Sequence, residues 1–159
     1  MANHLGVYNR KAFSIDYVAM MLEGAKTVDI KLSTRRIAPW QKITLGDYLY
    51  IKASSGPVVG RCLIPEVSYF ELRPGSMELL DVLIDIHDRV GLRDEEHAQR
   101  MFEQKMHMKY ATVFELDEPE ELQLPVDIEK SDRRTWIADY HLPTELRMAF
   151  GISDELNKR

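Results

Sequence analysis

Two lysines, a threonine and an aspartate fall within six residues near the start of the chain: Lys26, Lys31, Thr27 and Asp29. A lysine ammonium can anchor a phosphate, or act as base or nucleophile when burial lowers its pKa. A neighbouring carboxylate can accept a hydrogen bond from the exocyclic amine of a nucleobase. The segment therefore predicts a site, with Lys26 and Asp29 as candidate catalytic residues and Thr27 and Lys31 as ligand contacts. The alternative for Asp29 and Lys31 is an exposed ion pair, which would contribute about 0 to 1 kcal/mol to stability.

A helix followed directly by a strand must position these side chains. Apolar residues at three-and-four spacing predict a helix over residues 14–23, with Ser14 capping its first turn. Gly24 comes directly after it, at a place where a positive φ is often needed. Alternation along the strand that follows predicts Lys26 on one face and Asp29 on the other.

Further groups of basic, aromatic and small residues are candidates for binding a nucleotide. Arginine forms paired, charge-assisted bonds with phosphate, and an aromatic face can stack on a splayed base for about 1 to 3 kcal/mol. Small residues let backbone N–H groups approach an oxyanion. For Trp40, a place in the hydrophobic core is an equally favoured interpretation. For the basic residues between 130 and 136, the neighbouring acidic residues could neutralise their charge. The candidates are Arg35, Arg36 and Trp40 in one loop; Lys52, Ser54, Ser55 and Gly56 in a turn; and Lys130, Arg133, Arg134 and Trp136 late in the chain.

The order of these motifs resembles the ASCH domain, a branch of the PUA-like superfamily. The matching residues are Gly24, Lys26, Thr27, Asp29 and Lys31, then Gly46-Asp47 and the turn over residues 52–60. The likeness covers about residues 4–70, and residues 109–114 and 130–136 match more weakly. The resemblance implies a small mixed β-barrel flanked by helices, with RNA or a nucleotide-like ligand as partner.

Some proteins that this chain resembles are amidohydrolases that act on an acylated cytidine. They use a lysine at the place of Lys26, a threonine three positions on, and a glutamate further along. Asp29 stands at the place of that threonine. A carboxylate cannot take over the role of a hydroxyl nucleophile without a change of mechanism.

Composition and charge predict one domain with an uneven distribution of charge. The chain has 159 residues, of which 45% are hydrophobic, and a net charge of −5. Residues 1–62 hold nine Lys and Arg against four Asp and Glu, whereas residues 63–159 hold twelve against twenty-two. The basic half contains the motifs, which favours an anionic partner there. A solvated surface without a partner is an equally weighted alternative, and the overall charge argues against a broad nucleic-acid footprint.

Together with the remaining elements, the sequence predicts a single α+β domain over residues 1–159. The sequence predicts a helical insertion at about 74–108, an acidic turn at 118–121 and a short helical tail within 143–159. No leader or apolar run of membrane-spanning length is present, which favours a cytoplasmic protein without a membrane partner.

No cofactor or metal is expected from the sequence. Three histidines, His87, His97 and His107, are spaced ten residues apart, which does not bring them to one face of a helix. Surface positions are the favoured interpretation, and Cys62 is expected to be a small buried residue.

The sequence thus favours a domain that binds a single-stranded RNA segment or one exposed base in a basic cleft. The alternative is a small hydrolase acting on a modified nucleoside or on RNA, with Lys26 as its central group. A third hypothesis is an interaction module whose acidic C-terminal half docks a protein partner.

Overall fold

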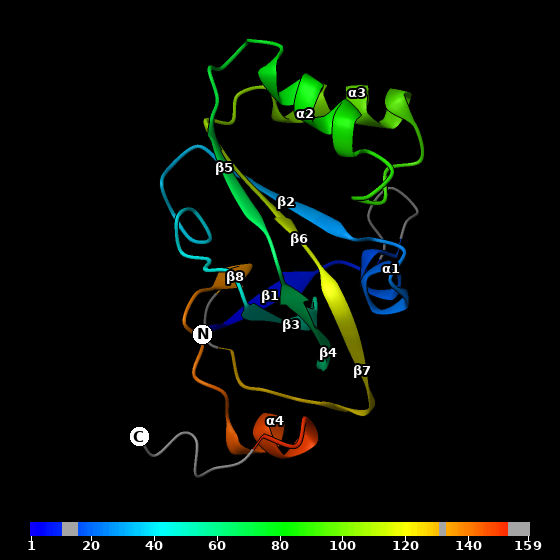
Figure 1. The fold of residues 1–159 in the computed structure, drawn as a ribbon, viewed down its shortest axis with the longest axis vertical. Helices are drawn as coiled ribbons and strands as arrows, with labels where there is room; N and C mark the ends of the chain where they lie inside the picture. Colours follow the sequence, from blue (N-terminus) through cyan, green and yellow to red (C-terminus); the bar gives the residue numbers. More distant parts are fainter. Residues whose placement is uncertain (11–15, 131–132, 153–159) are drawn as a thin grey trace.

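The computed structural model describes residues 1–10, 16–130 and 133–152, and the mixed α+β class predicted from the sequence is confirmed. Within these residues, eight strands form two sheets that are accompanied by four helices (Figure 1). Strand pairing in this part of the chain keeps the sheets separate, so the predicted closed barrel is corrected to two sheets. The two shortest connections between the sheets are Leu116 and Pro65-Glu66. Proline lacks the N–H that a continuous ladder needs.

The larger sheet has five strands, and the N-terminal strand β1 pairs with its middle strand, β3. β1 pairs in parallel with β3, and the other neighbours are antiparallel. In order across the sheet, the strands are β7 (Asp117–Val126), β4 (Val58–Ile64), β3 (Asp47–Ala53), β1 (Asn3–Tyr8) and β8 (Trp136–Ile137).

The smaller sheet has three antiparallel strands and leaves β2 at a free edge. Its order is β2 (Val28–Ser33), β6 (Tyr110–Glu115) and β5 (Val67–Glu71). Two helices, α2 (Glu78–Ile86) and α3 (Glu95–Lys105), lie together at one end of the molecule (Figure 1), within the segment where the sequence predicted helices.

The two faces of β2 have opposite character, which brings polar groups inside the molecule. Val28 and Ile30 belong to a hydrophobic cluster with residues of α2 and α3. Asp29 and Lys31 lie on the other face, where both contact Tyr8 of β1. Alternation along an edge strand therefore delivers a carboxylate and an ammonium to the space beside β1.

The helix before β2 is shorter than the sequence predicted. α1 spans Tyr17–Glu23, and its cap is Asp16, whose side chain accepts a hydrogen bond from the Ala19 N–H. Ser14, the predicted cap, lies outside the described residues. Gly24 adopts a φ of 78° and ends the helix, as predicted.

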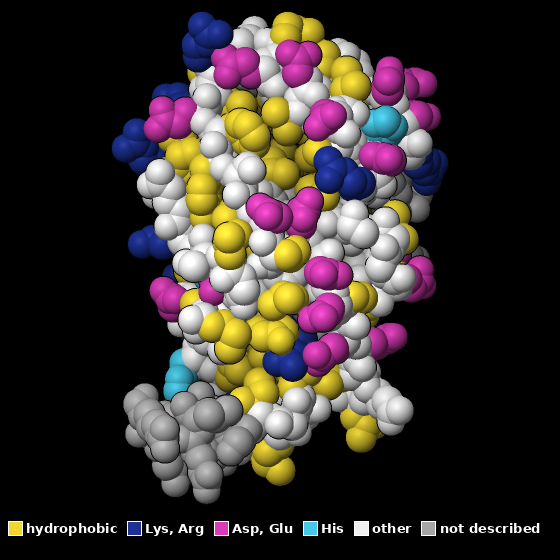
Figure 2. Space-filling view, in the orientation of Figure 1, with side chains coloured by type: hydrophobic (Ala, Val, Ile, Leu, Met, Phe, Trp, Pro, Cys, Tyr) yellow, Lys and Arg dark blue, Asp and Glu magenta, His cyan; other side chains and the backbone are white. Residues whose placement is uncertain are grey.

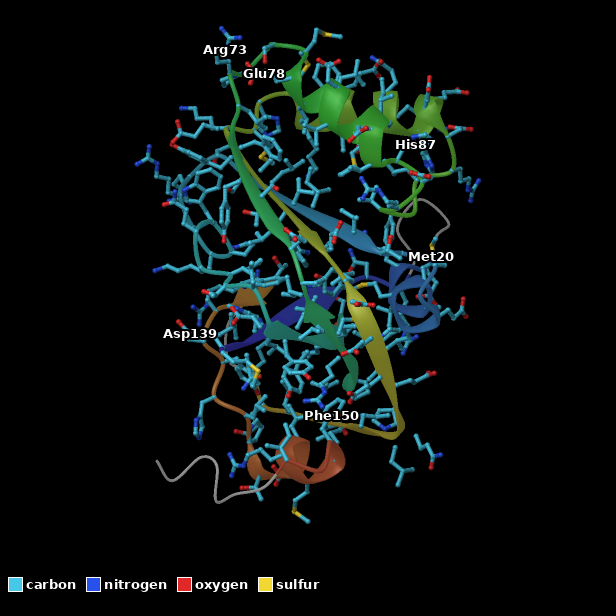
Figure 3. The ribbon with its side chains drawn as sticks, in the orientation of Figure 1. Met20, Arg73, Glu78, His87, Asp139 and Phe150 are labelled. Carbon is cyan, nitrogen blue, oxygen red and sulfur yellow. The ribbon has the colours of Figure 1, made fainter. Side chains whose placement is uncertain are left out.

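The last helix packs beneath the five-stranded sheet. α4 spans Thr144–Ala149, and Phe150 at its end reaches the ring of Tyr50 with centroids 5.2 Å apart (Figure 3). Arg61 of β4 lies over the ring of Phe150 as well, at 4.9 Å from its centroid. Aromatic and cation–π contacts thus join the C-terminal segment to the sheet.

Two other predictions from the sequence are corrected. Residues 118–121 are part of β7 rather than a turn, because the backbone of this segment pairs with β4 and Glu120 binds Arg61 at 2.9 Å. His97 is buried rather than on the surface, at 6% exposure. Among the described residues, no group of three His, Cys, Asp or Glu side chains could hold a metal ion, and no helix is long and apolar enough to cross a membrane.

Asp47, from the Gly46-Asp47 motif, ties the start of β1 to the start of β3. Its buried carboxylate accepts hydrogen bonds from the N–H groups of Ala2 and Thr44, each at 2.8 Å, and pairs with Nε2 of His4 at 2.7 Å. Asp47 is therefore a structural residue.

We expect Asp47→Asn to lower the free energy of unfolding by about 1 to 3 kcal/mol, because the amide nitrogen replaces one accepting oxygen in a buried site. Urea unfolding of both proteins at pH 7 measures the effect. An unchanged free energy of unfolding would show that these hydrogen bonds contribute nothing.

Candidate functional site

A cavity of about 330 Å³ lies along the free edge of β2. Its wall is built from the end of β1, from α1, from the corner between α1 and β2, from the segment after α2, and from α3. Thr135, directly before β8, closes another side. The polar residues of the wall are Tyr8, Asn9, Tyr17, Lys26, Asp29, Lys31, Lys105 and Thr135.

Lys26 lies just before β2, and all three N–H bonds of its ammonium have partners. Nζ is 2.9 Å from the Val28 carbonyl oxygen, 2.8 Å from that of Val90 and 3.2 Å from Oδ1 of Asp29. The side chain is 4% exposed. The predicted separation of Lys26 and Asp29 on opposite strand faces is wrong, because the strand begins at Val28 and alternation does not extend back to Lys26.

Asp29 is the centre of the site, and both of its oxygens are occupied. Oδ1 pairs with Lys26, whereas Oδ2 accepts a hydrogen bond of 2.7 Å from the Tyr8 hydroxyl and lies 3.8 Å from Nζ of Lys31. The side chain is 8% exposed, so the exposed ion pair considered for Asp29 and Lys31 is not what forms. A carboxylate has about four lone-pair directions, which leaves room for one more donor from the cavity.

Two more lysines face the cavity, and they give it a positive balance. Lys31 is 22% exposed, and its ammonium lies 4.1 Å from the centroid of the Tyr8 ring. Lys105 comes from the last turn of α3. Three lysines, including Lys26, therefore oppose one carboxylate in the described part of the cavity wall, a charge balance that favours an anionic ligand.

The surroundings shift the pKa values of the central groups. Burial lowers the pKa of Lys26, although Asp29 opposes this shift. Burial would raise the pKa of Asp29, but Lys26, Lys31 and the Tyr8 hydroxyl outweigh burial and hold the pKa of this carboxyl below its ordinary value. Burial and then Asp29 raise the pKa of Tyr8 well above its ordinary value. At neutral pH the site therefore contains a carboxylate and a protonated phenol.

The lowered pKa of Asp29 predicts acid sensitivity. A carboxyl group whose pKa is lower in the folded state stabilises the protein above its unfolded pKa, and that contribution is lost as pH falls. Hydrogen bonds from Ala2, His4 and Thr44 also outweigh burial and lower the pKa of Asp47. We expect the free energy of unfolding to fall as pH drops below about 5. Urea unfolding from pH 7 to pH 3 measures this, and the fall should be smaller in Asp47→Asn, which lacks one of the two groups.

A second, smaller cavity of about 80 Å³ adjoins the first. Lys31 and Thr135 line both cavities, and Thr112, Pro39 and Trp136 line the smaller one. Thr112 lies directly opposite Lys31 in the register of β2 and β6. Of the late residues that the sequence offered as ligand contacts, Trp136 lines the smaller cavity, beside Thr135.

The residues of the loop after β2 that the sequence proposed as ligand contacts do not line the larger cavity. Arg36 binds the hydroxyl of Tyr110 and the carboxylate of Glu71, and Arg35 is exposed. Trp40 is 7% exposed and packs against the rings of Tyr69 and Tyr110. Its burial favours the core position that the sequence left open.

The turn after β3 and the late basic residues lie outside the two cavity walls. Lys52 is buried and donates to the Ala53 carbonyl at 3.3 Å, and the N–H of Ser54 donates to the Tyr8 carbonyl. Ser55, Gly56, Arg133 and Arg134 line neither cavity, and neither does the partly buried Lys130. Thr27 is exposed, and its backbone pairs with Arg89 and Leu116.

Sequence reasoning missed Tyr8, Tyr17 and Lys105. Tyr8 reaches the site from the end of β1, in the other sheet, and Lys105 reaches it from α3; both depend on packing between segments that are distant in the sequence. A local signal existed for Lys105, since Met101 and Lys105 are four residues apart on one helix face and both line the cavity. Met20 of α1 packs against Gly91 in the segment that supplies Val90 to this site (Figure 3).

Asp and Glu side chains do not form one dense patch on the face of the molecule seen in Figure 2. Asp and Glu side chains are spread over that face, and Lys and Arg lie mainly toward its margins.

Comparison with known proteins finds solved structures with a similar fold. No protein-family model and no curated protein matches the sequence. Among solved structures, ASCH from Zymomonas mobilis superposes with a TM-score of 0.62 at 14% identity, covering 94% of each chain. A point mutant of that protein has a TM-score of 0.62 at 15% identity and covers 95% of this chain and 97% of its own. This chain has the ASCH fold. The resemblance to ASCH domains noted in the sequence is thereby confirmed at the level of the fold over nearly the whole chain, although the strands form two sheets rather than the barrel that it implied.

Proposed function

We propose that this ASCH-fold protein binds a nucleotide, either free or as one exposed unit of a single-stranded RNA, in the cavity around Asp29. The observation that carries the proposal is a buried carboxylate, held ionised, in a cavity whose wall has three lysines. Lysines bind phosphate as point charges, and a carboxylate accepts from the exocyclic amine of a base.

The size of the cavity supports a single unit as the ligand. Small-molecule sites occupy about 300 to 1,000 Å³. At about 330 Å³, the cavity is at the lower end of this range and suits one nucleoside rather than several consecutive bases. A strand of RNA would therefore insert one base and leave its neighbours outside.

The experiment is a titration of the protein with the four ribonucleoside monophosphates and with a short single-stranded RNA at two salt concentrations. Binding should weaken at the higher salt because lysines contact phosphate. Nucleotides whose base carries an exocyclic amine should bind more tightly than uridine monophosphate, which offers Asp29 no such donor. Absence of binding to every ligand at low salt would contradict the proposal.

One observation favours a hydrolase as the second candidate. A lysine with a lowered pKa beside a carboxylate in a cavity is a common feature of catalytic sites. Against this role, the three hydrogens of the Lys26 ammonium already bind Val28, Val90 and Asp29, so the group is held in its protonated form. Turnover that disappears in Lys26→Met while ligand binding remains would favour the hydrolase.

A further inference from the structure

A groove of about 470 Å³ lies between α2 and the three-stranded sheet, apart from both cavities beside Lys31. No described residue lines both the groove and either cavity. Figure 2 shows hydrophobic side chains gathered on this face of the molecule, beneath α2. Apolar side chains along an open groove are a common feature of surfaces that bind another protein. The apolar residues of the lining are Val28, Val67, Phe70, Val82, Ile86 and Val113.

The charged residues of the groove are mainly acidic. Glu66 and Asp85 are exposed, and the side chain of Glu115 is 45% exposed. Arg89 is the one cation of the described lining, and its guanidinium lies 3.8 Å from the Glu115 carboxylate. Three carboxylates against one guanidinium give the groove a negative balance, opposite to that of the cavity around Asp29, and favour a cationic ligand.

β5 borders this groove, and it is the second free edge of the three-stranded sheet. No residue of β5 is buried. The Glu66 carbonyl and the Leu72 N–H bond to the strand side of β6, so alternation in the antiparallel ladder turns every second residue between them outward. These outward N–H and C=O groups have no hydrogen bond to another described residue. They belong to Val67, Tyr69 and Glu71.

We propose that the groove and the free edge of β5 dock an extended, cationic segment of another protein, which adds a strand to the three-stranded sheet. The backbone of the segment bonds to the outward groups of β5. Alternate side chains of a strand face one side of a sheet, so apolar ones cover Phe70 while lysines or arginines between them meet Glu66. This docking site is separate from the proposed nucleotide site.

Charge decides between this occupant and two others. β5 of a second copy, with Glu66 and Glu71, has two carboxylates and no cation, so it does not complement the groove. RNA is disfavoured by the same acidic balance. A cationic strand supplies both the backbone partners and the opposite charge, which neither of the other two provides.

A labelled short peptide of alternating lysine and valine is the probe, titrated into the full chain at low and high salt. It should bind at low salt, weaken at high salt, and shift the backbone amide signals of Val67, Tyr69 and Glu71. The same peptide with alternate backbone nitrogens methylated should bind about tenfold or more weakly in the methylation register that removes the donated hydrogens. A peptide of alternating glutamate and valine should not bind.

Variants of the rim should change the affinity in opposite directions. Glu66→Gln should weaken binding of the cationic peptide about two- to fivefold, whereas Arg89→Gln should strengthen it by a similar factor. Glu121→Gln is the matched control, because Glu121 is exposed and does not line the groove. All three positions are exposed, so the fold should be retained, and nucleotide binding should be unchanged in Glu66→Gln.

Several results would overturn the proposal. These are absence of peptide binding at low salt, equal binding of the acidic peptide, no effect of backbone methylation in either register, and equal losses in Glu66→Gln and Glu121→Gln. Self-association of the free protein with shifts confined to β5 would assign the edge to a second copy instead. None of these results bears on the cavity around Asp29, so the docking site and the nucleotide site fail or stand separately.

Discussion

Replacing Asp29 by Ala is expected to lower the free energy of unfolding by about 3 to 5 kcal/mol, because it leaves the ammonium of Lys26 buried without its counter-ion. Lys26 is 4% exposed and bound to two carbonyls and Asp29, so it cannot turn toward solvent without losing those contacts. The Tyr8 hydroxyl loses its acceptor as well. Urea unfolding at pH 7 measures the change.

The control for this prediction removes both charges. In the double variant Lys26→Met with Asp29→Leu, no unpaired charge remains, and apolar replacements of buried ion pairs are often close to neutral. The double variant should therefore be more stable than Asp29→Ala. If it were equally destabilised, the loss would come from packing rather than from the buried charge.

The second large effect concerns Lys31, whose side chain is 22% exposed and therefore more accessible than that of Lys26, at 4%. Lys31→Ala should weaken the binding of a ribonucleoside monophosphate by about tenfold or more, because a charge-assisted hydrogen bond is lost. For single-stranded RNA, the slope of log affinity against log salt should become shallower by about 0.7, since one fewer phosphate is neutralised. Lys31 is partly exposed, so the change should leave the fold intact.

Lys42→Ala is the matched control for Lys31→Ala. Lys42 is an exposed lysine that lines neither cavity, so its removal changes the net charge by the same amount without touching the site. An equal loss of affinity in both variants would point to a general charge effect and would contradict a specific contact from Lys31.

The part of the site that could be predicted from the sequence is the part built by local structure. A helix that ends at Gly24 and a strand that follows directly are both visible in the sequence, and they bring Lys26, Asp29 and Lys31 to one corner. The position where the strand begins also decides the geometry of the site. Lys26 lies two residues before β2, so the alternation of side chains along the strand does not apply to it, and its ammonium pairs with Asp29.

The remaining contacts depend on packing between distant segments. Tyr8 donates to Asp29 from β1, a strand of the other sheet, and the Val90 carbonyl reaches Lys26 from a segment 64 residues away. Trp40 shows the opposite case. Its indole ring could stack on a base, but in the structure the ring packs against Tyr69 and Tyr110. Spacing along the chain carries no information about such neighbours.

The closed barrel was wrong for a related reason. The resemblance implied a barrel, but it did not show that the chain would leave one sheet at Pro65 or that β6 would be followed directly by β7 of the other sheet. The acidic residues before Leu122 suggested a turn, yet their backbone completes the edge of the five-stranded sheet while their side chains stay in solvent.

The measurement that tests nucleotide binding at this site most directly is a titration of isotope-labelled protein with cytidine monophosphate and with uridine monophosphate, followed through the backbone amide signals. We predict that cytidine monophosphate shifts the signals of Tyr8, Asp29 and Lys31 and those around Val90 and Thr135, and that uridine monophosphate does so more weakly. No shifts at millimolar ligand, or shifts confined to the loop of Arg35 and Trp40, would contradict the account.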